Sequence, residues 1–167
     1  MRNRLFLPAA LLVFVFALGL TLQTTLAASQ QLTVQIETGK QTVLTRADIE
    51  ALPRVKVTTA ASGVSTTFEG VPLRAVLEKA GVGFGETLKG KRMASCLLVE
   101  AADDYRVVIA LPEVDPRFTD KQVILAFLKD GKPLDDKEGP YRIVIPDEKR
   151  MARWVRQVTT LKIVEVQ

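Results

Sequence analysis

The chain has 167 residues, with 23 basic and 19 acidic side chains, no histidine and a single cysteine. Without histidine, a Ser-His-Asp or Cys-His hydrolase is excluded, and the most common zinc and copper ligand is missing. Cys96 has no second cysteine with which to form an intramolecular disulfide.

The first 27 residues have the layout of a secretory signal peptide. Arg2 and Arg4 form a basic start, an apolar stretch runs over residues 5–20, and small residues follow. The apolar stretch is shorter than the ~20 residues that a membrane-spanning helix needs. We therefore predict a signal peptide over residues 1–27 and an exported domain over residues 28–167, periplasmic or secreted, with no stable membrane span after cleavage. An uncleaved membrane anchor is the alternative.

The charge of the predicted mature domain is nearly balanced. Two of the 23 basic residues lie in the leader, so 21 remain against 19 acidic residues, a net charge of +2. Such a balance predicts no general binding to nucleic acid. The remaining 140 residues are enough for one domain with a core of its own.

Short strands and one short helix are predicted first along the chain. Alternation of apolar and polar residues predicts strands over residues 32–37 and 41–44. Thr45 and Asp48 have the spacing of a capping box, which begins a short helix that Pro53 ends. The next predicted strand covers residues 54–59, followed by a loop or loosely paired strand over residues 60–67.

The clearest helix is predicted at about residues 71–80. Pro72 stands in its first turn, and Gly81 follows as a C-terminal stop. Its apolar face is formed by residues that recur at helical spacing: Leu73, Val76, Leu77 and Ala80.

Strands dominate the second half of the chain, and the predicted strands are residues 93–101, 105–111, 123–128, 141–145 and 161–166. The strand over residues 123–128 is nearly all apolar, so both of its faces should be buried. Asp130-Gly131 predicts a tight turn. Cys96 lies in an apolar run and is predicted to be a buried, inert thiol.

The segment before the last strand permits two interpretations. Met151, Trp154, Val155 and Val158 share one face of a helix, although a strand is possible. Strands and short helices mix without a regular βαβ repeat, which predicts an α+β fold: a single compact domain with mixed β-sheet and short helices.

Five short motifs, in this order, resemble the molybdopterin-binding domain of the sulfite oxidase family. One of them is Gly139-Pro140-Tyr141-Arg142 through Pro146, which is similar to the family's GP-x-R-x-x-x-P strand. The other motifs are residues 70–81, 102–105, 130–134 and 153–163. The resemblance implies the fold of that family.

The resemblance implies a molybdenum cofactor for enzymes of that family. A pterin dithiolene and one cysteine thiolate of the protein hold the molybdenum ion there. That cysteine would be expected within residues 57–63, which contain none, and Cys96 lies in a different strand. The family's exported enzymes use a twin-arginine signal, whereas Asn3 separates Arg2 from Arg4. We therefore expect no metal ligand, no catalytic residue and no bound cofactor, with molybdopterin as the alternative.

The function hypothesis is a non-catalytic binding or accessory domain. Its partner would be an anionic small molecule, bearing phosphate or carboxylate, or an extracytoplasmic protein. Arginine forks suit such anions, and the candidate binding residues are Tyr105, Arg142, Lys149, Arg150, Arg153 and Arg156. The arginines could instead form a solvated helix face, and Tyr105 could be a half-buried strand residue. The alternative function is a molybdopterin-dependent oxidoreductase with an atypical metal site.

Overall fold

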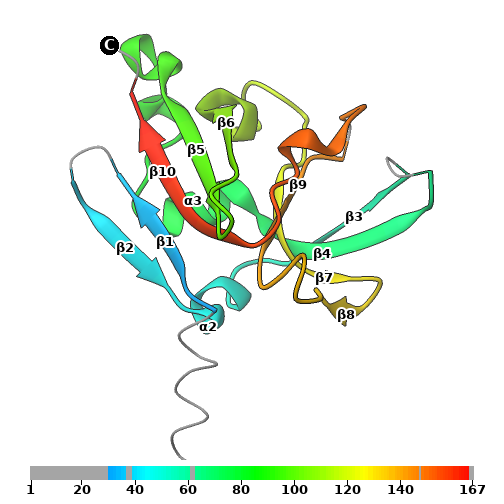
Figure 1. Cartoon of the computed structure of the whole chain (residues 1–167). Helices are drawn as coiled ribbons and strands as arrows, with labels where there is room; N and C mark the ends of the chain where they lie inside the picture. The colour runs from blue at the N-terminus through cyan, green and yellow to red at the C-terminus, as the bar shows by residue number, and fades with distance from the viewer. Residues whose placement is uncertain (1–29, 37–38, 61–62, 147, 166–167) are drawn as a thin grey trace, which may run out of the picture. The chain divides into compact units, whose positions relative to one another are not determined.

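The alternating segments of the sequence form two five-stranded sheets joined by few short helices (Figure 1). The computed structural model describes residues 30–36, 39–60, 63–146 and 148–165, and residues 31–167 form one unit. The predicted signal peptide lies outside the described residues. Among the helices of the described part, none has both the length and the apolar character to cross a membrane. The α+β class predicted from the sequence is confirmed.

The first sheet has the strand order β2-β1-β10-β5-β6, with β1 and β10 parallel and the other pairs antiparallel. Its strands are β1 (Leu32–Gln35), β2 (Gln41–Leu44), β5 (Cys96–Ala101), β6 (Arg106–Ala110) and β10 (Val158–Val164). The alternation of each strand sends every second side chain into the core. These core residues include Leu32, Val34, Leu97, Val99, Leu161 and Ile163.

The second sheet is built around β7 (Ile124–Lys129). One edge of β7 pairs with β4 (Thr66–Pro72), which in turn pairs with β3 (Val55–Thr59). β7 also pairs with β9 (Arg142–Val144) over its first residues and with β8 (Lys132–Pro133) over its last. The first four residues of β7 are buried, as predicted for this apolar strand.

β4 and β7 approach each other closely at Gly70. A Cβ at this position would lie 2.1 Å from the Leu125 carbonyl oxygen and 2.6 Å from the Ala126 Cα. The register of the pair also shifts between Glu69 and Gly70. The glycine of this motif is therefore required by backbone packing.

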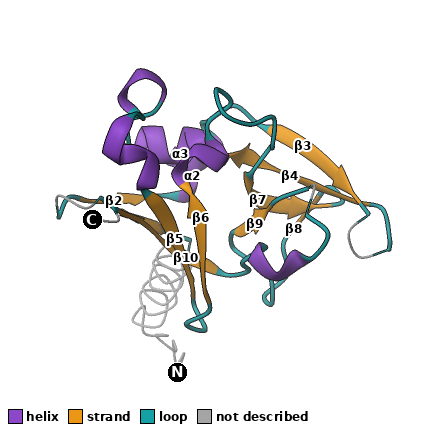
Figure 2. Ribbon diagram, turned by 90° about the horizontal axis from the view of Figure 1, so that it is seen from above, coloured by secondary structure: helices purple, strands orange, loops and turns teal. Residues whose placement is uncertain are grey.

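The two α-helices of the described residues are short, and local signals set their ends (Figure 2). α2 (Arg46–Glu50) begins with the predicted capping box: Thr45 Oγ1 accepts from the Asp48 N–H at 3.2 Å, and the Asp48 carboxylate accepts from the Thr45 N–H at 3.0 Å. α3 (Leu73–Lys79) has Pro72 at its N-cap and Gly81 at a φ of +99° beyond its end. The core receives Leu73, Val76 and Leu77 from α3.

The helical interpretation of residues 151–158 is wrong. Only η5 (Met151–Arg153), one turn of 3₁₀-helix, forms there, and residues 154–157 are not helical. β10 begins at Val158. The reason is pairing with the neighbouring strand: the Ile143 N–H donates to the Val155 carbonyl at 2.8 Å, and the Val158 N–H donates to the Tyr141 carbonyl at 3.0 Å. Trp154 is nevertheless buried, at 4% exposure.

The strand predicted over residues 93–101 is shorter than expected. Its first residues belong to the 3₁₀-helix η3 (Gly90–Ala94), and β5 starts at Cys96. Cys96 is partly exposed, so the prediction of a buried thiol is also wrong. The alternation of β5 turns Leu97 and Val99 to the core and Cys96 to the opposite face.

Candidate functional site

A large cavity lies where three loops of the two sheets meet. It has a volume of about 840 Å³. The lining residues come from the turn after β5, the segment from β8 to the start of β9, and the segment between β9 and β10. They are Asp103, Tyr105, Asp136, Lys137, Glu138, Arg142, Met151, Ala152, Trp154, Arg156 and Gln157.

Hydrogen bonds fasten these three segments to one another. The Tyr105 hydroxyl donates to the Ala152 carbonyl at 2.7 Å, which joins the β5–β6 turn to η5. Gln157 Nε2 donates to the Asp136 carbonyl at 2.6 Å, and the Gln157 N–H donates to the Glu138 carbonyl at 3.0 Å. The walls of the cavity are therefore held together before any ligand arrives.

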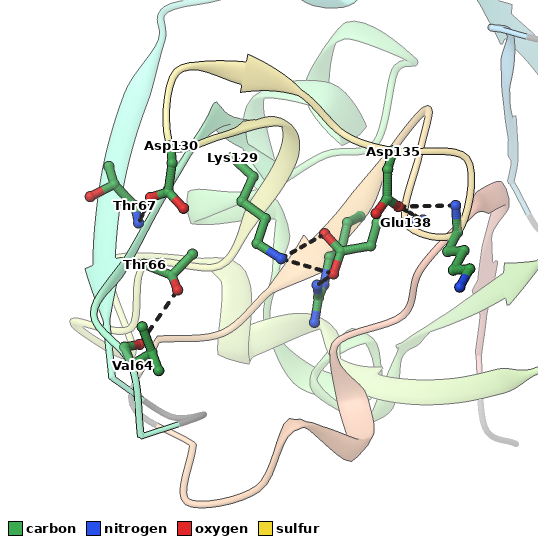
Figure 3. Close-up of polar contacts among 9 residues, drawn as sticks. Val64, Thr66, Thr67, Lys129, Asp130, Asp135 and Glu138 are labelled. Atoms are coloured by element: carbon green, nitrogen blue, oxygen red, sulfur yellow. Dashed lines mark hydrogen bonds and ion pairs between the residues drawn. The ribbon is translucent and has the colours of Figure 1, made fainter.

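Arg142, the first residue of β9, is almost buried and is paired within the protein. Its Nη1 donates to Glu138 Oε1 at 2.5 Å, and the exposed fractions of the two side chains are 8% and 13%. Lys129 Nζ lies 3.3 Å and 3.4 Å from the two carboxylate oxygens of Glu138. Figure 3 shows the Lys129 ammonium directed at the Glu138 carboxylate. One carboxylate thus pairs with two cations.

Aromatic rings cover the two cations on one side. The Arg142 Cζ lies 5.2 Å from the centre of the Phe68 ring and 5.7 Å from that of Trp154. The Phe68 and Trp154 rings meet edge to face, with centres 5.9 Å apart. Such contacts favour a buried guanidinium and fix its orientation at the cavity wall.

Two buried donors in this wall have no partner among the described residues: Arg142 Nε and Trp154 Nε1. An unpaired buried donor costs about 1–3 kcal/mol. Both side chains line the large cavity and the smaller one beside it. The wall therefore contains two N–H groups that no described residue satisfies.

The structure brings three of the six predicted binding residues to this cavity: Tyr105, Arg142 and Arg156. The Tyr105 side chain is 47% exposed. Arg156 is exposed and has no ion-pair partner within the described part of the chain. Lys149 and Arg150 are exposed and line no cavity described here.

Arg153, the sixth predicted residue, is bound elsewhere. Its Nη2 lies 3.2 Å from a Glu113 carboxylate oxygen, and it also pairs with Glu148. The hydrogen bonds that Arg153 donates to Glu113 and Glu148 raise the pKa of Arg153 above its usual value, although burial opposes them. Burial alone would raise the pKa of Glu113, but the bonds and charge of Arg153 lower it overall. Arg153 therefore ties η4 (Leu111–Val114) to the segment before η5.

The sequence-based reasoning missed the acidic half of the cavity. Three acids line it, Asp103, Asp136 and Glu138, against three bases, Lys137, Arg142 and Arg156. Most of these positions lie in or next to the motifs that carry the family resemblance. The motifs therefore indicate where the lining residues lie in the sequence, but not that acids equal bases among them. The site is charge-balanced, not cationic.

A smaller cavity of about 140 Å³ adjoins the first and shares Glu138, Arg142, Met151 and Trp154 with it. Thr59, from the segment in which the family's cysteine would be expected, lines this smaller cavity. Cys96 lies in the other sheet and lines neither cavity. The described residues also contain no group of three or more Cys, Asp or Glu side chains placed to hold a metal ion. The side chains present therefore do not fit a protein-ligated molybdenum site.

Comparisons with known proteins agree with this fold. The inducible nitrate reductase [NADH] 1 of Glycine max is 31% identical over 111 aligned residues, covering 59% of this chain and 12% of that protein. The crystal structure of the sulfane dehydrogenase SoxCD from Paracoccus pantotrophus matches with a TM-score of 0.64 and 25% identity, covering 83% of this chain and 39% of that chain. This chain thus spans only a minor part of either relative.

The profile of one protein family, described as the oxidoreductase molybdopterin binding domain, matches residues 20–167. This range includes both sheets and all three segments of the cavity. The resemblance inferred from the five motifs is therefore confirmed, and the chain belongs to the oxidoreductase molybdopterin-binding domain family, of the sulfite oxidase type.

Proposed function

We propose that this protein is an exported, non-catalytic binding domain. It would bind a small molecule with an anionic group, or an extracytoplasmic protein partner, at the large cavity. The observation that carries the proposal is the absence of cysteine from residues 57–63, a range of which Thr59 lines the smaller cavity. A molybdenum ion of the family's kind needs a soft sulfur ligand from the protein, and no thiol stands at these cavities.

The cavity has features that favour ligand binding without metal chemistry. Its volume is within the usual range for small-molecule sites. Arg156 offers a guanidinium without a partner among the described residues, and such a fork suits carboxylate or phosphate. Tyr105 and Met151 add exposed apolar surface at the same cavity.

Membership of the family favours a second candidate, a molybdopterin-dependent oxidoreductase with an atypical metal site. The relatives named above are a nitrate reductase and a sulfane dehydrogenase. Their activities belong to much longer proteins. In this candidate, the pterin alone would supply the sulfur ligands.

Elemental analysis of protein purified from its native compartment separates the two candidates. We expect far less than one molybdenum per chain. Cys96 is partly exposed, so it should also react with a thiol reagent in the folded protein, as a thiol that ligates a metal would not.

The Cys96→Ser variant provides the control for this experiment. We expect the substitution to change neither metal content nor ligand binding. About one molybdenum per chain, lost in Cys96→Ser, would overturn the binding-domain proposal and assign the thiol to the metal. Molybdenum retained in the variant would also overturn it and would indicate coordination by the pterin alone.

A further inference from the structure

The charge balance of the large cavity limits the kind of ligand that it can attract. Arg142 cannot act as a free cation there, because Glu138 already pairs with it and with Lys129. The remaining charged groups are two bases, Lys137 and Arg156, and two acids, Asp103 and Asp136. A phosphate dianion would meet both signs of charge, so its attraction to the bases would be offset by repulsion from the acids.

Opposite charges without partners lie on neighbouring segments of the wall. Within the described part of the chain, the Asp136 carboxylate and the Arg156 guanidinium take part in no ion pair or side-chain hydrogen bond. The hydrogen bonds from Gln157 to the backbone of Asp136 and Glu138 hold these two segments together. Asp136 and Arg156 thus present a negative and a positive group to one cavity.

Apolar surface accompanies this pair of charges. Tyr105 and Met151 are 47% and 38% exposed, and Trp154 forms part of the wall. The unpaired N–H groups of Trp154 and Arg142 lie in the same wall. A carboxylate oxygen is an acceptor that either donor could bind.

We propose that the cavity binds a zwitterion of the α-amino-acid class with an apolar or aromatic side group. Arg156 binds the carboxylate, Asp136 binds the ammonium group, and Tyr105 and Met151 contact the side group. The inference rests on the proposed binding function and specifies its ligand. It predicts selectivity for a molecule that carries both charges over one that carries either charge alone.

Four probes test this selectivity by isothermal titration calorimetry on protein purified after expression of the full chain. They are L-phenylalanine, N-acetyl-L-phenylalanine, L-phenylalaninamide and inorganic phosphate. The first three share one side chain. The N-acetyl derivative lacks the ammonium charge, and the amide lacks the carboxylate charge. We expect L-phenylalanine to bind at least about tenfold more tightly than either derivative, since each derivative loses one charge-assisted contact.

Substitutions assign each charge to its residue. Arg156→Gln should weaken binding of L-phenylalanine and of the N-acetyl derivative. Asp136→Asn should weaken binding of L-phenylalanine and of the amide but leave the N-acetyl derivative unaffected. Matched controls are Lys91→Gln and Asp120→Asn, which alter exposed residues outside the cavity and should change no affinity.

Three results would overturn the inference. The first is failure of L-phenylalanine to bind. The second is binding of the N-acetyl derivative as tight as that of L-phenylalanine. The third is an Asp136→Asn variant that binds like the wild type. If phosphate binds through Arg156 and L-phenylalanine does not bind, this inference fails but the proposed binding function holds, with the cavity as an anion site.

Stoichiometric molybdenum would overturn the proposed function, whether or not L-phenylalanine binds.

Discussion

Asp115 is a buried carboxylate that joins three segments of the chain. It is fully buried, and it accepts hydrogen bonds from Arg74 Nη1 at 2.9 Å, the Gly85 N–H at 2.9 Å and the Arg117 N–H at 3.0 Å. Burial would raise the pKa of Asp115. The two backbone donors and the charges of Arg74 and Arg117 outweigh burial, and the pKa is lowered from 3.8. The carboxylate is therefore ionised at neutral pH and stabilises the fold in that form.

The stabilising effect of Asp115 should depend on pH. Asp115→Asn should lower the free energy of unfolding by about 1.5–3 kcal/mol at pH 7, the range for hydrogen bonds to a charged group. Because the pKa of Asp115 is lowered in the folded state, this contribution to stability is present above about pH 3.8. It is lost as the pH falls through the folded-state pKa. Urea unfolding at pH 7, 4 and 3 measures the difference, with Asp120→Asn as the exposed control. A difference that stays constant down to pH 3 would contradict the ionised assignment.

At the scale of one element, α3 is a helix whose apolar sequence positions form part of the core. Its three inward side chains, Leu73, Val76 and Leu77, are each 0% exposed. The sequence sets these positions through helical spacing between Pro72 and Gly81. Most of the stability of so short a helix must come from packing of this apolar face.

Leu77→Ala should therefore lower the free energy of unfolding by about 2–5 kcal/mol, as expected for an emptied leucine site in a core. The control is Lys79→Ala in the same helix, where the side chain is exposed and the effect should be small. Chemical denaturation of the two variants gives both values. A loss below about 1 kcal/mol for Leu77→Ala would mean that this face does not pack as described.

Elements with local signals were predicted well, and elements set by distant partners were not. The capping box at Thr45 and Asp48 and the turn at Asp130-Gly131 follow from neighbouring residues, and both are present. The segment 151–158 has apolar spacing typical of a helix, but its backbone pairs with β9 instead. That choice depends on pairing with β9, and no pattern within residues 151–158 indicates this pairing.

The residues of the candidate site could also be predicted only in part, because distant partners decide which of them are paired. Arg142, Arg156 and Tyr105 were identified because they belong to motifs or carry a suitable group, and all three line the cavity. Arg153 carries the same group but is bound by Glu113, which lies 40 positions away in the chain. Only the folded structure shows which arginines are already paired.

At the scale of the whole molecule, export remains the prediction with the simplest test. The basic start and apolar stretch of residues 1–27 predict cleavage by signal peptidase. N-terminal sequencing of the extracytoplasmic pool should find a chain that begins near Ala28. Recovery of intact Met1 in a membrane fraction would instead establish an anchor.

The place of β10 in its sheet has a consequence for the order of folding. β10, near the end of the chain, lies between β1 and β5, so it joins the earliest strand to the middle of the sequence. Contacts between residues so far apart close large loops, which slows folding. A chain that emerges from a translocation channel with its N-terminus first cannot complete this sheet until residues 158–164 have passed. On the predicted export route, the native state of the domain would therefore become accessible only after residues 158–164 had left the channel.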